Sequence, residues 1–352
     1  MINRMKAAVF KDIETIVLEE RPIPECPEGG MLIKVRACGI CGGDVRNYHN
    51  GLKGGVKDQI MGHEIAGEVI KVSNRITHFK EGDRVALAPD VSCGTCWYCK
   101  HGYVNLCTSH RMLGTHFPGG YAQYMALPSE VIQRGFVEPI PEGMSFEQAA
   151  FAETAAAVIA CQKLNNISLG DTVVIIGDGP VGCLHIEVAR ARGAKKIILI
   201  GMDKLELAAQ FKPDLLLSNK NPEEVIAEVI RETDGVGADF VISAVPSVRP
   251  QQQALEMVRK RGRVIIYGGT PKNAEMTTLN SNLIHYNEIM VVGAFSYPAT
   301  GLADALSAIH TKKINAKKYL NAKVSLEDVV KGMDMVTRGE ALKVIIDPWM
   351  NN

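Results

Sequence analysis

Three glycines that directly follow a β-branched strand constrain the fold of this chain most. In Gly177-x-Gly179-x-x-Gly182 the first glycine permits a tight turn, the second lets the backbone approach a pyrophosphate, and the third allows close packing of helix on strand. The next helix opens at Pro180 and Val181 and offers unpaired N–H groups to phosphates. Around this motif, apolar strands alternate with helices such as 251–261, which predicts a doubly wound parallel sheet that binds a dinucleotide.

The end of the following strand bears on which coenzyme binds. An acid there accepts hydrogen bonds from the adenosine ribose hydroxyls and selects NAD. Here Gly201 stands in that place, and Asp203 comes two residues late. If the turn is short, Asp203 reaches the ribose; otherwise Gly201 leaves room for a 2′-phosphate, with Lys204 as its counter-charge. We favour NAD and leave NADP open.

The chain length and charge bound the remaining possibilities. With 352 residues the chain is too long for one ordinary core, and its first 150 residues form short strands broken by glycine and proline. The formal net charge is zero, so nothing favours nucleic acid or an anionic membrane as a partner. The sequence has no apolar run of 18 residues, and its first six residues lack the apolar core of a signal peptide. We expect a cytoplasmic protein of two domains that acts on a small molecule.

Four cysteines in one short run predict a metal-bound lobe at about residues 90–110. Four thiolates this close together suit a closed tetrahedral zinc site. Bacterial ferredoxins also begin C-x2-C-x2-C, but their fourth cysteine comes sooner and precedes a proline, whereas Cys107 here precedes Thr108. We therefore predict a structural zinc held by Cys93, Cys96, Cys99 and Cys107.

A second set of metal-binding residues comes from distant segments: Cys41, His63, Glu64 and Glu153. Mixed ligands of this kind suit an open, catalytic zinc. Glu153 lies in an Ala-rich helix that begins at a capping box, Ser145-Phe-Glu-Gln148, and a largely buried carboxylate is costly unless it is paired or bound to metal. Whether Glu64 or Glu153 binds the metal directly stays open. Asp44 is suited to orient a ligand histidine.

With these residues the chain resembles the zinc-dependent medium-chain alcohol and polyol dehydrogenase superfamily nearly end to end. Glu153, where liver-type alcohol dehydrogenases carry a cysteine ligand, resembles the sorbitol and threonine dehydrogenase branch. The resemblance implies an α/β fold: a GroES-like β-rich catalytic domain at 1–152, a Rossmann domain at 153–294, and a segment at 295–352 that returns to the first. The motifs that carry it are Cys41-Gly-Gly-Asp44, Gly62-His63-Glu64 with Gly67, Gly82-Asp83-Arg84-Val85, the cysteine lobe, Gly119-Gly120-Tyr121-Ala122 and the dinucleotide turn.

The resemblance also implies an activity: hydride transfer between a secondary alcohol and NAD(P), with a catalytic and a structural zinc in each subunit of a homodimer or homotetramer. One departure concerns the proton. The family usually has Ser or Thr two residues after the cysteine ligand, where this chain has Gly43. Water in that space would pass the proton to His49, whose unperturbed pKa suits a shuttle near neutral pH, unless His49 is a surface histidine.

A second departure concerns the substrate. Sorbitol dehydrogenases carry an arginine between two aromatic residues late in the chain, where this chain has Phe295-Ser296-Tyr297. Polar groups near the motifs favour a polyol, sugar or hydroxy acid derivative over a long alkyl alcohol. Two alternatives remain: an NADPH-dependent aldehyde or ketone reductase of the same family, and a non-catalytic zinc- and nucleotide-binding relative, which Gly43 alone supports. The candidate substrate residues are Asn47, Tyr48, His116, Phe117, Ser296 and Tyr297.

Overall fold

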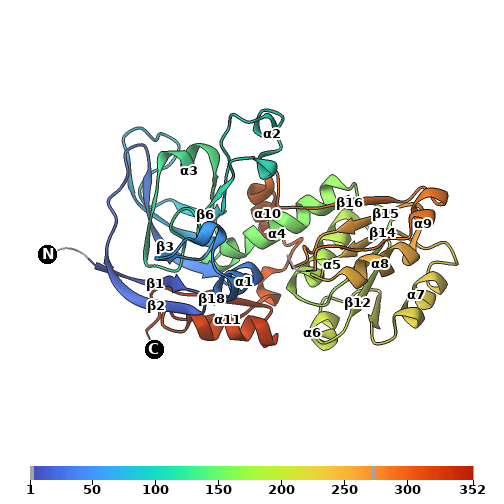
Figure 1. Ribbon diagram of the computed structural model, residues 1–352. Coiled ribbons are helices and arrows are strands. Elements are labelled where there is room, and N and C mark those ends of the chain that lie inside the picture. The colour runs from blue at the N-terminus through green and yellow to red at the C-terminus, as the bar shows by residue number, and fades with distance from the viewer. Residues whose placement is uncertain (1–3, 272–273, 352) are drawn as a thin grey trace. The chain divides into compact units, whose positions relative to one another are not determined.

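The computed structural model describes residues 4–271 and 274–351, and the chain divides into two compact units (Figure 1). The first comprises Met1–Ala156 and Tyr297–Asn352, and the second Ala157–Ser296. The boundaries expected from the sequence, at 152 and 294, lie slightly earlier than these. Glu153 therefore belongs to the first unit rather than to the dinucleotide-binding one.

The first unit is built on a mixed sheet that includes the C-terminal segment. Its strand order is β10-β6-β5-β3-β18-β17, and β9 pairs with β3. The strands are β3 (Met31–Gly39), β5 (Glu64–Val72), β6 (Arg84–Ala88), β9 (Tyr124–Leu127), β10 (Phe136–Pro139), β17 (Leu320–Val324) and β18 (Lys343–Ile346). Because β18 pairs antiparallel with β3, with Ile345 opposite Gly39, the end of the chain completes the sheet that carries the N-terminal residues.

Further strands and helices surround that sheet. A second sheet has the order β2-β1-β4, and β7 pairs with β8. These strands are β1 (Arg4–Asp12), β2 (Thr15–Pro22), β4 (Gln59–Ile60), β7 (Asp90–Val91) and β8 (Arg111–Met112). The helices are α1 (Gly42–Asn50), α2 (Trp97–Lys100), α3 (Ser129–Arg134), α10 (Gly301–His310) and α11 (Val329–Arg338). The core between them is apolar and includes the buried side chains of Ile33, Ile65 and Tyr121.

Helix α4 (Phe146–Leu164) begins at the capping box that the sequence predicts. The Ser145 hydroxyl accepts from the Gln148 N–H at 3.3 Å, and the Gln148 side-chain oxygen accepts from the Ser145 N–H at 3.1 Å. Two N–H groups that would otherwise lack partners at the helix start are thereby satisfied. Glu153 is thus fixed on the second turn of a well-defined helix.

The second unit is a parallel sheet in the order β13-β12-β11-β14-β15-β16. Its strands are β11 (Thr172–Ile176), β12 (Lys196–Gly201), β13 (Leu215–Ser218), β14 (Ala238–Ser243), β15 (Val258–Ile266) and β16 (Met290–Gly293). Its helices are α5 (Pro180–Arg192), α6 (Leu205–Ala209), α7 (Pro222–Arg231), α8 (Val248–Met257) and α9 (Ser281–Tyr286). The strand order reverses at β11, which has β12 on one side and β14 on the other, and ligands of such sheets bind at this reversal.

One expected helix is too long. The sequence predicts a helix over 251–261, but α8 ends at Met257 and β15 starts at Val258. Val258 pairs with Ala238 of β14, and Arg261 has a left-handed backbone conformation with φ +60°, which no helix continues through. Pairing with the neighbouring strand therefore overrides the local helical preference. Among the described residues, no helix is long and apolar enough to cross a membrane.

Candidate metal centres and coenzyme turn

Cys41 is held in place by the start of helix α1. Its side chain accepts from the Gly43 N–H at 3.4 Å, while the Asp44 carboxylate accepts from the Cys41 N–H at 3.0 Å. This reciprocal pair of bonds has the form of a capping box, with a thiol in the place of the usual hydroxyl. The arrangement fixes the Cys41 sulfur at the N-terminus of helix α1.

The same Asp44 side chain holds His63. Its Oδ1 lies 3.1 Å from His63 Nδ1, and its Oδ2 accepts from the Tyr121 hydroxyl at 3.0 Å. Burial raises the pKa of the Asp44 carboxyl, but His63 and three hydrogen bonds outweigh burial and lower it. Burial likewise opposes the charged form of His63, and Asp44 outweighs it, so the pKa of His63 is raised. With Nδ1 turned to Asp44, Nε2 is the nitrogen left for a metal ion.

Glu64 is fully buried and is engaged by Lys343 from the last strand. Lys343 Nζ lies 2.6 Å and 2.9 Å from the two carboxylate oxygens of Glu64, and the Thr154 hydroxyl donates to Oε1 at 2.9 Å. Burial lowers the pKa of Lys343, but the Glu64 carboxylate outweighs burial, so this pKa is raised and the lysine stays charged. Gly39 makes room for the pair, because a Cβ there would lie 1.9 Å from Glu64 Oε2.

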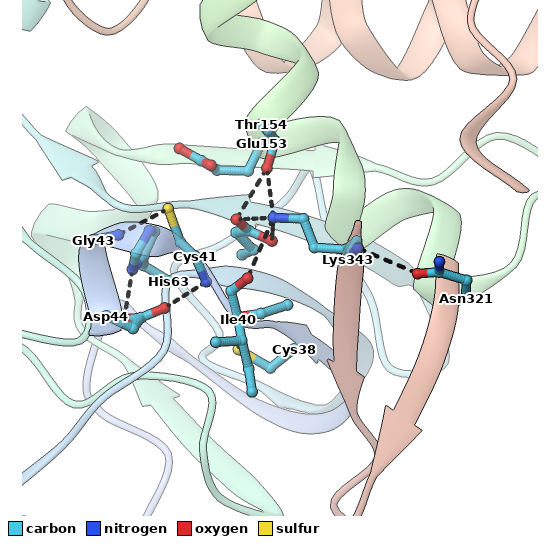
Figure 2. Close-up of polar contacts among 12 residues, drawn as sticks. Cys38, Ile40, Cys41, Gly43, Asp44, His63, Glu153, Thr154, Asn321 and Lys343 are labelled. Carbon is cyan, nitrogen blue, oxygen red and sulfur yellow. Dashed lines mark hydrogen bonds and ion pairs between the residues drawn. The ribbon is translucent and has the colours of Figure 1, made fainter. Parts of the chain in front are cut away.

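Glu153 extends from α4 toward Cys41 (Figure 2). The Tyr297 hydroxyl donates to its Oε1 at 2.9 Å. Burial raises the pKa of Glu153 to about 7; the Glu64 carboxylate adds to this rise and His63 opposes it. The charges of both His63 and Glu64 therefore act on the Glu153 carboxyl.

The donor atoms at this place fit a divalent metal ion. Ligand atoms of Cys41, His63 and Glu64 all lie within 4.8 Å of one another. Lys343 offsets the charge of Glu64 and Asp44 faces His63, which leaves the Cys41 sulfur and the Glu153 carboxyl as further donor groups. An excess of sulfur and carboxylate donors around one imidazole is the ligand chemistry of zinc.

The four cysteines of the loop also converge. Their sulfur atoms lie within 4.8 Å of one another, with 4.0 Å between Cys93 and Cys99 and 3.5 Å between Cys96 and Cys99. Tetrahedral zinc with Zn–S bonds of about 2.3 Å requires sulfur atoms roughly 3.8 Å apart, so this cluster fits a structural zinc. Hydrogen bonds from the backbone and hydroxyl of Thr95 lower the pKa of Cys93 to about 5, whereas burial raises that of Cys107 to about 11.

The glycine turn of the second unit has the geometry that the sequence predicts. Gly177 has φ +132°, and a Cβ on Gly182 would lie 1.8 Å from the Gly177 carbonyl oxygen. Gly179 caps α5, and Pro180 and Val181 occupy its first positions, with no side chain to cover the free N–H groups at the helix start. This turn therefore suits a pyrophosphate.

Comparisons with known proteins agree with this geometry. The alcohol dehydrogenase GroES-like domain matches residues 27–142, and the zinc-binding dehydrogenase domain matches residues 180–310. The chain is 34% identical over 356 residues to a sorbitol dehydrogenase of Bacillus subtilis, covering 98% of each protein. The chain belongs to the zinc-dependent medium-chain polyol dehydrogenase family. The expected α/β fold, with a GroES-like and a Rossmann domain, is thereby confirmed.

Two further relatives of this dehydrogenase show the breadth of the match. D-xylulose reductase A of Aspergillus oryzae is 32% identical over 352 residues, covering 96% of this chain and 95% of that protein. A putative zinc-binding dehydrogenase from Sinorhizobium meliloti, solved bound to NADP, is 28% identical with a TM-score of 0.89 and covers 98% of this chain and 100% of its own. The dehydrogenase is a zinc-dependent oxidoreductase that uses NAD(P).

Of the residues on α1 considered for proton transfer and substrate binding, His49 is exposed, whereas Asn47 and Tyr48 are partly buried. His49 Nδ1 lies 2.8 Å from Glu14 Oε1, and 46% of its side chain is exposed. Tyr48 donates its hydroxyl to the Glu14 carbonyl at 2.8 Å, while the Asn47 carbonyl accepts the N–H of Gly51, which ends the helix. These contacts match the surface environment that was the alternative for His49.

The other candidate substrate residues are spread over both units. His116 is exposed and its Nδ1 accepts from the Met112 N–H, and Phe117 packs under the Arg111 guanidinium. Ser296 is the last residue of the second unit. Tyr297 is 2% exposed, and its hydroxyl is engaged by Glu153.

Gly43 lies beside the candidate zinc ligands, as expected for the position where the family has a hydroxyl. A Cβ there would lie 3.7 Å from Cys41 Sγ and 3.9 Å from His63 Cε1, at ordinary contact distance. The same point is 3.9 Å from the Arg46 guanidinium, a residue that sequence reasoning did not single out. Arg46 is exposed and reaches the space beside the metal-binding residues. The only sign of this in the sequence is its position, five residues after Cys41.

Proposed function

We propose that this dehydrogenase transfers a hydride between a secondary alcohol of a polyol or sugar-like small molecule and NAD(P). The observation that carries the proposal is the convergence of Cys41, His63 and Glu64, whose ligand atoms lie within 4.8 Å of one another, with Glu153 extending toward Cys41. The names of two relatives, a sorbitol dehydrogenase and a D-xylulose reductase, support the substrate class.

In this proposal Cys41, His63 and Glu64 hold the catalytic zinc, and Glu153 faces it from α4. Bound zinc would supply Lewis-acid chemistry at the substrate oxygen, and a bound nicotinamide would supply the hydride acceptor. The protein's part is orientation. Asp44 fixes the ring of His63, and Lys343 and Thr154 hold the Glu64 carboxylate by hydrogen bonds of 2.6–2.9 Å.

Two supporting roles complete the proposal. The cysteine cluster at Cys93, Cys96, Cys99 and Cys107 holds a structural zinc that folds its loop, since structural zinc sites contribute folding energy directly. Gly177, Gly179 and Gly182 place the coenzyme pyrophosphate at the start of α5. We further propose, from the family resemblance, a cytoplasmic homodimer or homotetramer.

Metal analysis and a turnover screen test the function together. We expect two zinc ions per chain, and NAD(P)H formation with at least one member of a panel of polyols, sugars and their acids. Cys41→Ser should lower the zinc content by one and abolish turnover, whereas Cys96→Ser should lose the other zinc. A chain that binds a single zinc regardless of Cys41, and reduces neither coenzyme with any secondary alcohol, would overturn the proposal.

A further inference from the structure

Asp178, between the first two glycines of the turn, reaches across to the end of the neighbouring strand. Its Oδ2 accepts from the backbone N–H groups of Met202 at 2.8 Å and Lys204 at 2.7 Å, just beyond β12. Strands β11 and β12 are adjacent and parallel with Ile176 opposite Ile200, so the residues that follow each strand lie side by side. The Asp178 carboxylate is thus anchored at the carboxyl end of β12.

The Asp178 side chain fills the space that the glycine at this end leaves. A Cβ on Gly201 would lie 2.5 Å from Asp178 Cβ, 2.5 Å from its Oδ2 and 2.6 Å from its Cγ. All three of the nearest atoms belong to Asp178. Gly201 does not have a positive φ, so a larger residue there is excluded by Asp178 and not by the backbone.

This is the place where a dinucleotide-binding domain needs a carboxylate. The acid at the end of the second strand accepts hydrogen bonds from the ribose hydroxyls, which selects NAD because a 2′-phosphate would meet a negative charge. In this chain Asp203, the candidate from the sequence, is exposed and lies in the bend that follows β12. Both bonds to the loop use Asp178 Oδ2, and the side chain is partly exposed, so Oδ1 can face a ligand.

We propose that Asp178 is the coenzyme-selecting residue. Its carboxylate accepts hydrogen bonds from the adenosine ribose hydroxyls, so this chain prefers NAD to NADP. The acid stands on the glycine turn and not on the second strand, and residue 201 is glycine because the Asp178 side chain occupies its space. The inference rests on the proposed function in one respect, that the second unit binds a nicotinamide dinucleotide.

A purely structural role for Asp178 makes a different prediction. If its carboxylate only caps the loop between β12 and α6, its removal lowers stability and weakens both coenzymes alike. If it recognises the ribose, its removal weakens the binding of NADH and leaves the binding of NADPH unchanged or makes it tighter. The ratio of the two affinities therefore separates the roles, and binding can be measured without substrate.

The test uses the full-length, zinc-loaded protein and the fluorescence of the reduced nicotinamide on binding. We expect the wild type to bind NADH at least tenfold more tightly than NADPH. Asp178→Asn keeps the shape of the side chain and removes its charge, and should weaken NADH by about 10- to 100-fold, the range for hydrogen bonds to a charged acceptor. Asp203→Asn, the matched control, should leave the ratio unchanged.

Transposing the acid gives a second, independent test. Gly201→Asp alone places a second carboxylate in the space of the Asp178 carboxylate and should weaken the binding of both coenzymes. The double variant Asp178→Gly with Gly201→Asp should restore the preference for NADH; glycine is needed at 178 because even a Cβ there lies 2.5 Å from the new one. Thermal unfolding identifies any variant that fails to fold.

The proposal is overturned if the wild type prefers NADPH, or if Asp178→Asn leaves the NADH to NADPH ratio within about twofold while Asp203→Asn changes it. A double variant that folds but prefers neither coenzyme also contradicts it. Failure of the proposed function would instead appear in the zinc content and the turnover screen, with the coenzyme ratio intact.

Discussion

Lys343 Nζ lies 2.6 Å from Glu64 Oε1, although 279 residues separate the two along the chain. The contact exists because β18, which begins at Lys343, pairs with β3, and β3 pairs with β5, which begins at Glu64. Both side chains are buried, and the Lys343 ammonium also contacts the Thr154 hydroxyl at 3.1 Å. The last strand of the chain thus orients a carboxylate of the candidate zinc site.

Replacement of Lys343 by methionine should therefore damage both stability and metal binding. A buried carboxylate left without its partner costs about 3–5 kcal/mol, and loss of a residue that orients a ligand typically weakens metal affinity about 10- to 100-fold. Urea unfolding and competition for zinc with a chelator measure the two effects. The double variant Lys343→Met with Glu64→Gln should recover part of the stability. Equal losses in single and double variants would show that the ion pair is not the cause.

Loss of the Asp44 carboxylate should weaken zinc binding without removing a ligand. Asp44→Asn keeps the size of the side chain but provides a poorer acceptor for His63 Nδ1, so we expect the affinity for the catalytic zinc to fall by about 10- to 100-fold. The structural zinc should be unaffected, which metal analysis after partial chelation can show. Tyr121→Phe removes another partner of Asp44 and should have a smaller effect. An unchanged zinc affinity in Asp44→Asn would rule out the orienting role.

A hydroxyl restored at residue 43 should increase turnover. The space at Gly43 accepts a side chain at ordinary contact distance from Cys41 and His63, so Gly43→Ser should fold normally. If proton release limits the reaction, the serine hydroxyl should raise kcat by up to about 10²-fold, the lower range for a positioned proton-transfer group. Gly43→Ala is the matched control, because it adds the Cβ without the hydroxyl. Equal rates in the serine and alanine variants would show that another group already carries the proton.

Much of the local structure could be predicted from the sequence because its determinants are local. The glycine turn at 177–182 and the cap at Ser145 each depend on residues a few positions apart, and both have the expected form. The helix expected to run to residue 261 ended early because β15 pairs with β14, a contact that helical preference does not include.

The parts of the site that were missed depend on contacts between distant segments. Lys343 is an isolated lysine in an apolar strand, and its role becomes visible only once β18 is paired with β3. Asp178 did leave a signal, an acid inside the glycine turn of a chain that lacks one at Gly201. The acid at residue 178 and the glycine at residue 201 together indicate that the acid has moved from the strand end to the glycine turn. Only the structure shows that the Asp178 side chain fills the space beside Gly201.

The buried His185 should make the protein less stable in mild acid. It lies on α5 and is 0% exposed, and burial lowers its pKa to about 3. An unfolded histidine titrates near pH 6.5, so above that pH both states are neutral and His185 contributes no pH dependence. Below about pH 6.5 His185 binds a proton in the unfolded chain but stays neutral in the folded protein. The free energy of unfolding should therefore fall by about 1.4 kcal/mol for each pH unit between 6.5 and 3.

The variant His185→Leu isolates this effect because leucine cannot bind the proton. Urea unfolding followed by circular dichroism at pH 7.5 and 5.0 should show a stability loss in the wild type that exceeds that of the variant by about 2 kcal/mol. The difference between the two proteins cancels other titrating groups, Glu153 included, whose raised pKa acts in the opposite direction. His285→Gln, at an exposed histidine of the same unit, should leave the wild-type loss unchanged. If the leucine variant keeps the full acid sensitivity, His185 must take up its proton within the folded protein, and its hydrogen bond with Gln162 would then have to rearrange.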